Sequence, residues 1–106
     1  MRQGTTPTHT FKLPFDAQEV NSIEATYAQH DDRTKQDKVL MRKLIDGSAM
    51  DGSKARITLT QTETFDFEAD KLGMVQLRAF MKTGAVYGTR VYLFKVEKSL
   101  SREVLT

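Results

Sequence analysis

The chain has 106 residues and a mass of 12.1 kDa, which suits one domain with a single hydrophobic core. Its residues are 39% hydrophobic and 28% charged, as in folded globular proteins, and no apolar run approaches the roughly 20 residues of a membrane span. It has no cysteine, which excludes disulfides and thiolate chemistry, and its net charge of +2 does not by itself predict nucleic-acid binding.

The N-terminal residues 1–7 are polar and contain Gly4 and Pro7. We expect them to form a flexible arm, because they offer nothing that could pack against a core. The opening MRQGTTPTHTF also has no apolar segment of a secretory signal, so we expect a cytoplasmic protein that is not secreted by a signal peptide.

Two short strands are predicted next, because apolar residues alternate with polar ones. The first holds Phe11, Leu13 and Phe15, and its proline predicts an edge position because proline cannot donate to a ladder. The second holds Ile23, Ala25 and Tyr27 and runs to about residue 29 or 30. The polar residues 31–38 that follow are predicted to be a surface loop.

The segment 38–45, KVLMRKLI, fits two structures. As a helix it would be capped by Asp31 or Asp32 and would stop at Gly47. As a strand it would bury Val39, Met41 and Ile45, but it would also point Lys43 inward. We prefer the strand.

Residues 46–54 contain two Asp-Gly turn signals and are predicted to be a second surface loop. Ala55, Ile57 and Leu59 then alternate with polar residues as a strand. The sequence Thr60-Gln-Thr-Glu63 has the spacing of a capping box, which predicts one helical turn before the chain re-enters the core.

Residues 73–96 form the longest β-patterned stretch, which we predict to be a hairpin that turns at Thr83-Gly84. A polar tail, residues 97–106, follows it. The first strand of the hairpin is predicted to have an inner face that consists of Val75, Leu77, Ala79 and Met81.

The returning strand of this hairpin has alternative registers. With an odd loop, Tyr92 and Phe94 lie on the outer face with Arg78, Phe80 and Lys82. With an even loop, Tyr92 and Phe94 turn inward and Arg90 is buried, which is costly without a partner. A bulge near Tyr92 would place Val91, Phe94 and Val96 inside.

The pattern as a whole predicts an all-β protein: a single immunoglobulin-like β-sandwich of about six to seven antiparallel strands, and less favourably a small barrel. One candidate surface stands out, since basic and aromatic side chains of the hairpin could contact a protein partner or stack on bases. Its residues are Arg78, Phe80, Lys82, Arg90 and Tyr92.

Residues suited to catalysis or metal binding are scarce. A general base would require His9 or His30, and only His30 has neighbouring carboxylates, in Asp31 and Asp32. The two histidines lack the spacing of a zinc site, and Asp46 to Gly52 lacks the ligand pattern of a calcium loop. The sequence therefore predicts no enzyme, no cofactor and no small-molecule substrate.

Four stretches resemble a group of small β proteins of phages and prophages of Gram-positive bacteria that have no assigned activity. These stretches are RQGTTPTHTFKLPFD, TYAQ, ITLTQTETFDF and VQLRAFMKTG. The resemblance covers most of the chain except residues 31–54, and it carries over no functional residue. It implies a non-enzymatic virion or tail component, located in the virion or in the bacterial host's cytoplasm.

Our leading hypothesis is therefore a protein that acts by protein-protein contact in virion or tail assembly, with a protein partner or a second copy of itself. The alternative is a nucleic-acid-binding module that uses the basic and aromatic hairpin face.

Overall fold

The computed structural model describes residues 1–105 and confirms an all-β fold. Within these residues there are seven strands: β1 (Thr8–Lys12), β2 (Val20–Asp31), β3 (Gln36–Asp46), β4 (Lys54–Thr58), β5 (Leu72–Met81), β6 (Val86–Gly88) and β7 (Tyr92–Lys95). Three short helical segments connect them: η1 (Ala17–Glu19), η2 (Gly47–Ala49) and α1 (Gln61–Thr64). No helix among the described residues is long and apolar enough to span a membrane.

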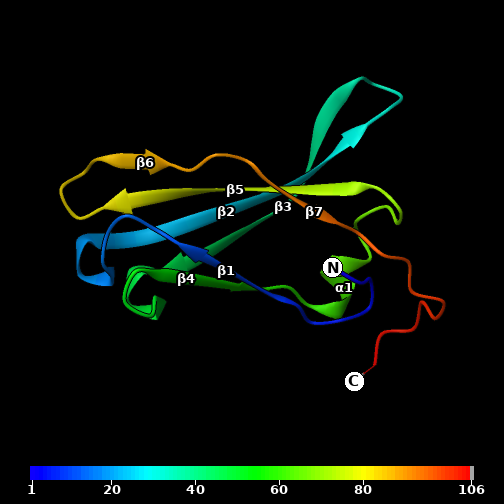
Figure 1. The fold of residues 1–106 in the computed structure, drawn as a ribbon, viewed down its shortest axis with the longest axis horizontal. Helices are drawn as coiled ribbons and strands as arrows, with labels where there is room; N and C mark the ends of the chain where they lie inside the picture. The colour runs from blue at the N-terminus through cyan, green and yellow to red at the C-terminus, as the bar shows by residue number, and fades with distance from the viewer. Residues whose placement is uncertain (106) are drawn as a thin grey trace.

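The strands form two antiparallel sheets that pack as a sandwich (Figure 1). One sheet contains only β1 and β4. The other has the order β3-β2-β5-β6. The strand β7 also pairs with β5, at the first residues of that strand. The immunoglobulin-like detail of the fold stays a prediction.

The core lies between the two sheets, because each sheet turns its apolar alternation toward the other. In the larger sheet these residues come from β2 and β5: Ile23, Ala25, Tyr27, Val75, Leu77 and Ala79. Phe11, Ala55 and Ile57 face them from the smaller sheet. Both alternations are those that the sequence predicted, since a side-chain period of two places one set of residues on a single face.

Segment 38–45 is a strand, as preferred from the sequence, and lies within β3 at the edge of the larger sheet. Met41 and Ile45 pack against the core as that strand predicts, but Val39 is exposed because the pairing shifts register after Met41. The inward Lys43 is satisfied by an ion pair: its Nζ lies 2.7 and 2.9 Å from the two carboxylate oxygens of Glu63 in α1. Glu63 also closes the predicted capping box, since its Oε1 accepts from the backbone N–H of Thr60.

In the hairpin at 73–96, the returning strand changes its register against β5, as the alternative with a bulge predicts. Val86 pairs with Phe80 and Tyr87 with Ala79, but Tyr92 pairs with Val75, so the return strand gains one residue in between. Tyr92, Phe94 and Val96 consequently belong to the core or pack against it, whereas Val91 is exposed, contrary to that alternative.

Residues 1–7 pack against distant parts of the chain. The sequence analysis expected a flexible arm because these residues offered nothing that could pack against a core. Gln3 is only 3% exposed, and its backbone N–H donates to the carbonyl of Glu97. Gly4 donates to the hydroxyl of Thr64. The sequence could not reveal this, because the partners are polar groups about 60 and 95 residues away.

Most of the predicted loop 31–38 is instead a β-hairpin. The β2–β3 pairing continues through His30 with Asp37 and Asp31 with Gln36, beyond Ala28, where the pairing of β2 with β5 ends. This end of the hairpin projects from the sandwich (Figure 1). Solvent reaches most of its side chains, so its strands lack the apolar alternation by which strands are recognised.

Candidate functional site

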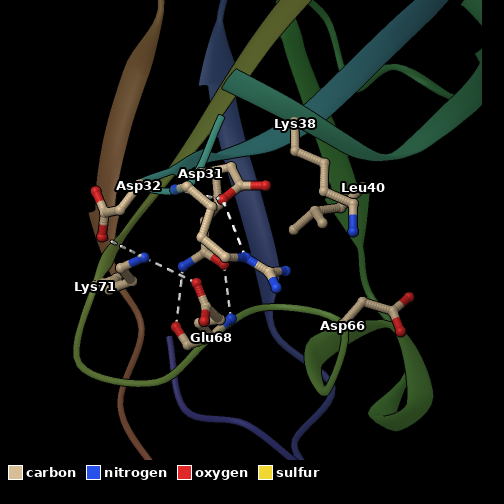
Figure 2. A pocket seen from close by; sticks show the side chains of 9 residues that line it. Asp31, Asp32, Lys38, Leu40, Asp66, Glu68 and Lys71 are labelled. Carbon is tan, nitrogen blue, oxygen red and sulfur yellow. Dashed lines mark hydrogen bonds and ion pairs between the residues drawn. The ribbon is translucent and has the colours of Figure 1, made fainter. Parts of the chain in front are cut away.

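A charged pocket of about 410 Å³ lies at the base of the projecting hairpin (Figure 2). Its walls come from the ends of β2 and β3 and from the loop between α1 and β5. Four carboxylates, three cationic side chains, one amide and one leucine line it: Asp31, Asp32, Asp66, Glu68, Arg33, Lys38, Lys71, Gln29 and Leu40. A volume of this size is within the range of small-molecule sites.

Gln29 fastens the two walls of the pocket together. It continues the inward alternation of β2, is 4% exposed, and uses both ends of its amide on one residue of the loop. Its Nε2 donates to the carbonyl of Glu68 at 2.9 Å, and its Oε1 accepts from the N–H of Glu68 at 2.6 Å. Because such a buried amide is costly to leave unpaired, it fixes the loop against the hairpin.

One side of the pocket is a network of ion pairs with one carboxylate in excess, since Asp31, Asp32 and Glu68 face only Arg33 and Lys71. The Nζ of Lys71 lies 2.9 Å from a carboxylate oxygen of Glu68 and 3.0 Å from one of Asp32. The hydrogen bonds that Lys71 donates, chiefly to Glu68 and then to Asp32, raise the pKa of Lys71 above its usual value. Asp31 is stabilised as a carboxylate mainly by the backbone N–H of Arg33, which lowers the pKa of Asp31.

Lys38 and Asp66 form the other side of the pocket. Lys38 extends from β3 toward the loop that carries Asp66, with Leu40 beside it (Figure 2). Neither side chain has an ion-pair partner within 4.0 Å among residues 1–105, although the remaining five charged side chains of the pocket each have one. The pocket thus presents one ammonium and one carboxylate without a direct ion pair, which can hold a ligand of mixed charge.

The five residues predicted as an interaction surface do not come together. Arg78 and Phe80 lie on the outer face of the larger sheet, where Arg78 binds Glu24 at 2.8 Å and lies 5.4 Å from the ring centroid of Phe80. Lys82 lies in the turn after β5. Arg90 stacks on the ring of Tyr92, whose side chain packs against Phe11 on the core side of the sheet.

The two histidines lie in different settings. The Nδ1 of His9 is 2.7 Å from the hydroxyl of the buried Tyr27, and its ring packs against Phe94. His30 lies on the hairpin, where Asp37 rather than its neighbours Asp31 and Asp32 is closest, at 3.1 Å. Within residues 1–105, no three His, Cys, Asp or Glu side chains are placed to hold a metal ion.

None of the pocket residues was singled out as a binding residue from the sequence. Residues 31–38 read as a loop and residues 66–71 as a connection, and only the tertiary fold brings the two together. The one available signal was Gln29, a polar residue that continues the buried alternation of Ile23, Ala25 and Tyr27 and therefore needs a buried partner.

Neither protein-family models nor curated proteins match the chain, and the resemblance to phage proteins stays a prediction. One solved structure similar to it is a superoxide reductase (neelaredoxin) from Ignicoccus hospitalis. The alignment covers 92% of this chain and 73% of that protein, with 14% identity and a TM-score of 0.51. At this identity the likeness shows a shared all-β fold and assigns none of that protein's activity to this chain.

This match corrects the functional prediction. This similar structure is that of a superoxide reductase and not of a virion component, which contradicts the predicted role in virion or tail assembly and its nucleic-acid-binding alternative. The reductase activity itself does not carry over with the fold.

Proposed function

We propose that the chain is a small ligand-binding protein whose pocket at the base of the β2–β3 hairpin holds a compact molecule carrying both an ammonium and a carboxylate group. The observation that supports this is the pair Lys38 and Asp66, each without a direct ion pair, on one side of a pocket of about 410 Å³. The proposal concerns the binding of this molecule alone.

The two charges favour a zwitterion over a simple ion. Asp66 would accept hydrogen bonds from the ligand's ammonium group, and Lys38 would donate to its carboxylate. Each such charge-assisted hydrogen bond contributes about 1.5–3 kcal/mol, so two of them correspond to a dissociation constant near the millimolar range. The exposed stem of Lys38 beside Leu40 can adjust to the length of the ligand.

Free amino acids are suitable probes. We expect L-glutamine, followed by ¹H–¹⁵N NMR titration, to shift amide signals in residues 29–40 and 66–71. N-acetyl-L-glutamine amide, which carries neither terminal charge, should shift them much less. Equal shifts with the two compounds, or none with either, would refute the proposal.

Two substitutions test the charge pair. Asp66→Asn and Lys38→Gln should each weaken binding of L-glutamine by about tenfold, because each removes one charge-assisted hydrogen bond. Lys54→Gln, which makes the same change in the smaller sheet, is the matched control and should leave the affinity unchanged. The same loss in the control would show that the effect comes from net charge and not from this pocket.

A further inference from the structure

The outer face of the larger sheet carries much of the exposed apolar surface of the described chain. One row crosses four strands, since Val39 pairs with Ala28, Ala28 with Met74, and Met74 with Leu93. Val39 and Leu93 are 44% and 61% exposed. A shallow groove of about 180 Å³ lies along this row, beside Ala28 and Met74.

The neighbouring rows of this face are polar and follow the same register. Thr26 pairs with Gln76, and Glu24 pairs with Arg78, whose guanidinium lies 2.8 Å from the Glu24 carboxylate. Each of these three rows therefore pairs complementary groups on β2 and β5. The small Ala28 lies beside the large Met74, the hydroxyl of Thr26 beside the amide of Gln76, and the acid Glu24 beside the base Arg78.

We infer that this face is an interface between two copies of the chain, related by a two-fold axis that runs parallel to the strands between β2 and β5. Rotation about such an axis places each row of one copy over the same row of the other. It also exchanges the two strands, so that β2 of one copy covers β5 of the other. Every complementary pair within a copy then recurs between copies.

The contacts that follow are specific. The Met74 side chain of one copy enters the groove beside Ala28 of the other, and Val39 meets Leu93 across the interface. Glu24 of each copy lies over Arg78 of the other, which joins the two internal ion pairs into one network of four charges. Four strands spaced by about 4.8 Å over about 25 Å of length cover roughly 500 Å² per copy, near the lower limit for a specific interface.

A charge exchange tests this arrangement. Light scattering after size-exclusion chromatography should show a dimer for the wild-type chain. Glu24→Arg and Arg78→Glu alone should each weaken dimerisation by at least tenfold, because each places like charges opposite one another. An equimolar mixture of the two variants should recover a mixed dimer, since every introduced charge then meets its opposite.

Two further variants test whether the dimer forms through this face of the larger sheet. Met74→Glu should abolish the dimer by placing an unpaired charge in the apolar row, whereas Lys12→Glu, on the smaller sheet, should not. Circular dichroism checks that every variant keeps its fold. The inference is overturned if the wild-type chain stays monomeric at about millimolar concentration, if the mixture of variants stays monomeric, or if Met74→Glu still dimerises.

Discussion

At the scale of single residues, Lys43 is a charged residue that the alternation of β3 turns toward the core. A strand that buries Met41 and Ile45 must also turn Lys43 toward the core. The cost is offset because Glu63 already stands at the start of α1, where it caps the helix and is held by Thr60. Burial opposes the ionisation of Glu63, but hydrogen bonds from Lys43 and Thr60 outweigh it and lower the pKa of Glu63.

His9 is a second residue whose protonation is coupled to folding. Burial, and to a lesser extent the N-terminal ammonium group, lower its pKa below the usual 6.5. The folded chain therefore binds a proton at His9 less readily than the unfolded chain does. This residue's contribution to stability is present above pH 6.5 and is lost as the pH falls from there through the lower folded pKa.

We predict that the free energy of unfolding of the wild-type chain decreases between about pH 7.5 and 5.5 and that His9→Gln removes part of this decrease. Glutamine keeps a hydrogen-bonding group near the hydroxyl of Tyr27 but does not titrate. Urea unfolding at a series of pH values measures the effect. An unchanged slope in His9→Gln would contradict the prediction.

At the scale of elements, the return strand of the 73–96 hairpin owes its register change to Thr89. Its backbone N–H donates to the carbonyl of Leu77, and its hydroxyl accepts from the N–H of the same residue at 3.0 Å. A side-chain oxygen thus takes the place of a backbone carbonyl in the ladder. The chain gains one residue, and the alternation continues with Tyr92 and Phe94 inside.

The connection between β3 and β4 depends on a close approach at Gly47. This buried residue lies in η2 against β2, and a Cβ atom added to it would lie 2.0 Å from the carbonyl oxygen of Val20. Since the carbonyl of Val20 belongs to the backbone and the position of the added Cβ is fixed by the backbone of residue 47, no side-chain rotation can relieve the clash.

We predict that Gly47→Ala lowers the free energy of unfolding by about 2–4 kcal/mol, because it forces η2 away from β2. Gly88→Ala is the matched control: nothing lies within 4 Å of an added Cβ there, so the change should stay within about 0.5 kcal/mol. Chemical denaturation compares the two. Similar stabilities for both variants would show that the connection can shift without cost.

At the scale of the whole molecule, the first residues tie distant parts of the chain together. The side-chain amide of Gln3 donates to the carbonyl of Phe67 at 2.7 Å, and its oxygen accepts from the N–H of Ser99. Gln3 therefore joins the segment before β1 to the connection before β5 and to the segment after β7. Both of its side-chain groups are removed from water, which makes the loss of either partner costly.

We predict that Gln3→Ala lowers the free energy of unfolding by about 1–3 kcal/mol, because it leaves the buried carbonyl of Phe67 without its donor. Thr6→Ala, on the exposed part of the same segment, should change it by less than about 0.5 kcal/mol. Urea denaturation measures both variants. An equally small effect at Gln3 would mean that this segment contributes nothing to stability.

The candidate pocket and the proposed dimer also belong to this scale, and they differ in how far the sequence could predict them. Arg78 was predicted as a surface residue, and alternation alone places Met74, Gln76 and Arg78 on one face of a strand. Its partner Glu24 comes from another strand, so the row that joins them depends on the register. The pocket could not be predicted, because Lys38 and Asp66 come from segments without periodicity.

The sequence by itself determined the all-β fold, the inner faces of β2 and β5 and the cap of α1. These follow from local rules, the period of two and the spacing of a capping box, which act within a few residues. Only the tertiary structure decided where Tyr92 and Phe94 lie, what Lys43 pairs with and how the N-terminal residues pack. These depend on partners far away in the sequence, since a buried polar group or a bulge is stabilised by whichever distant group the fold brings within hydrogen-bonding distance.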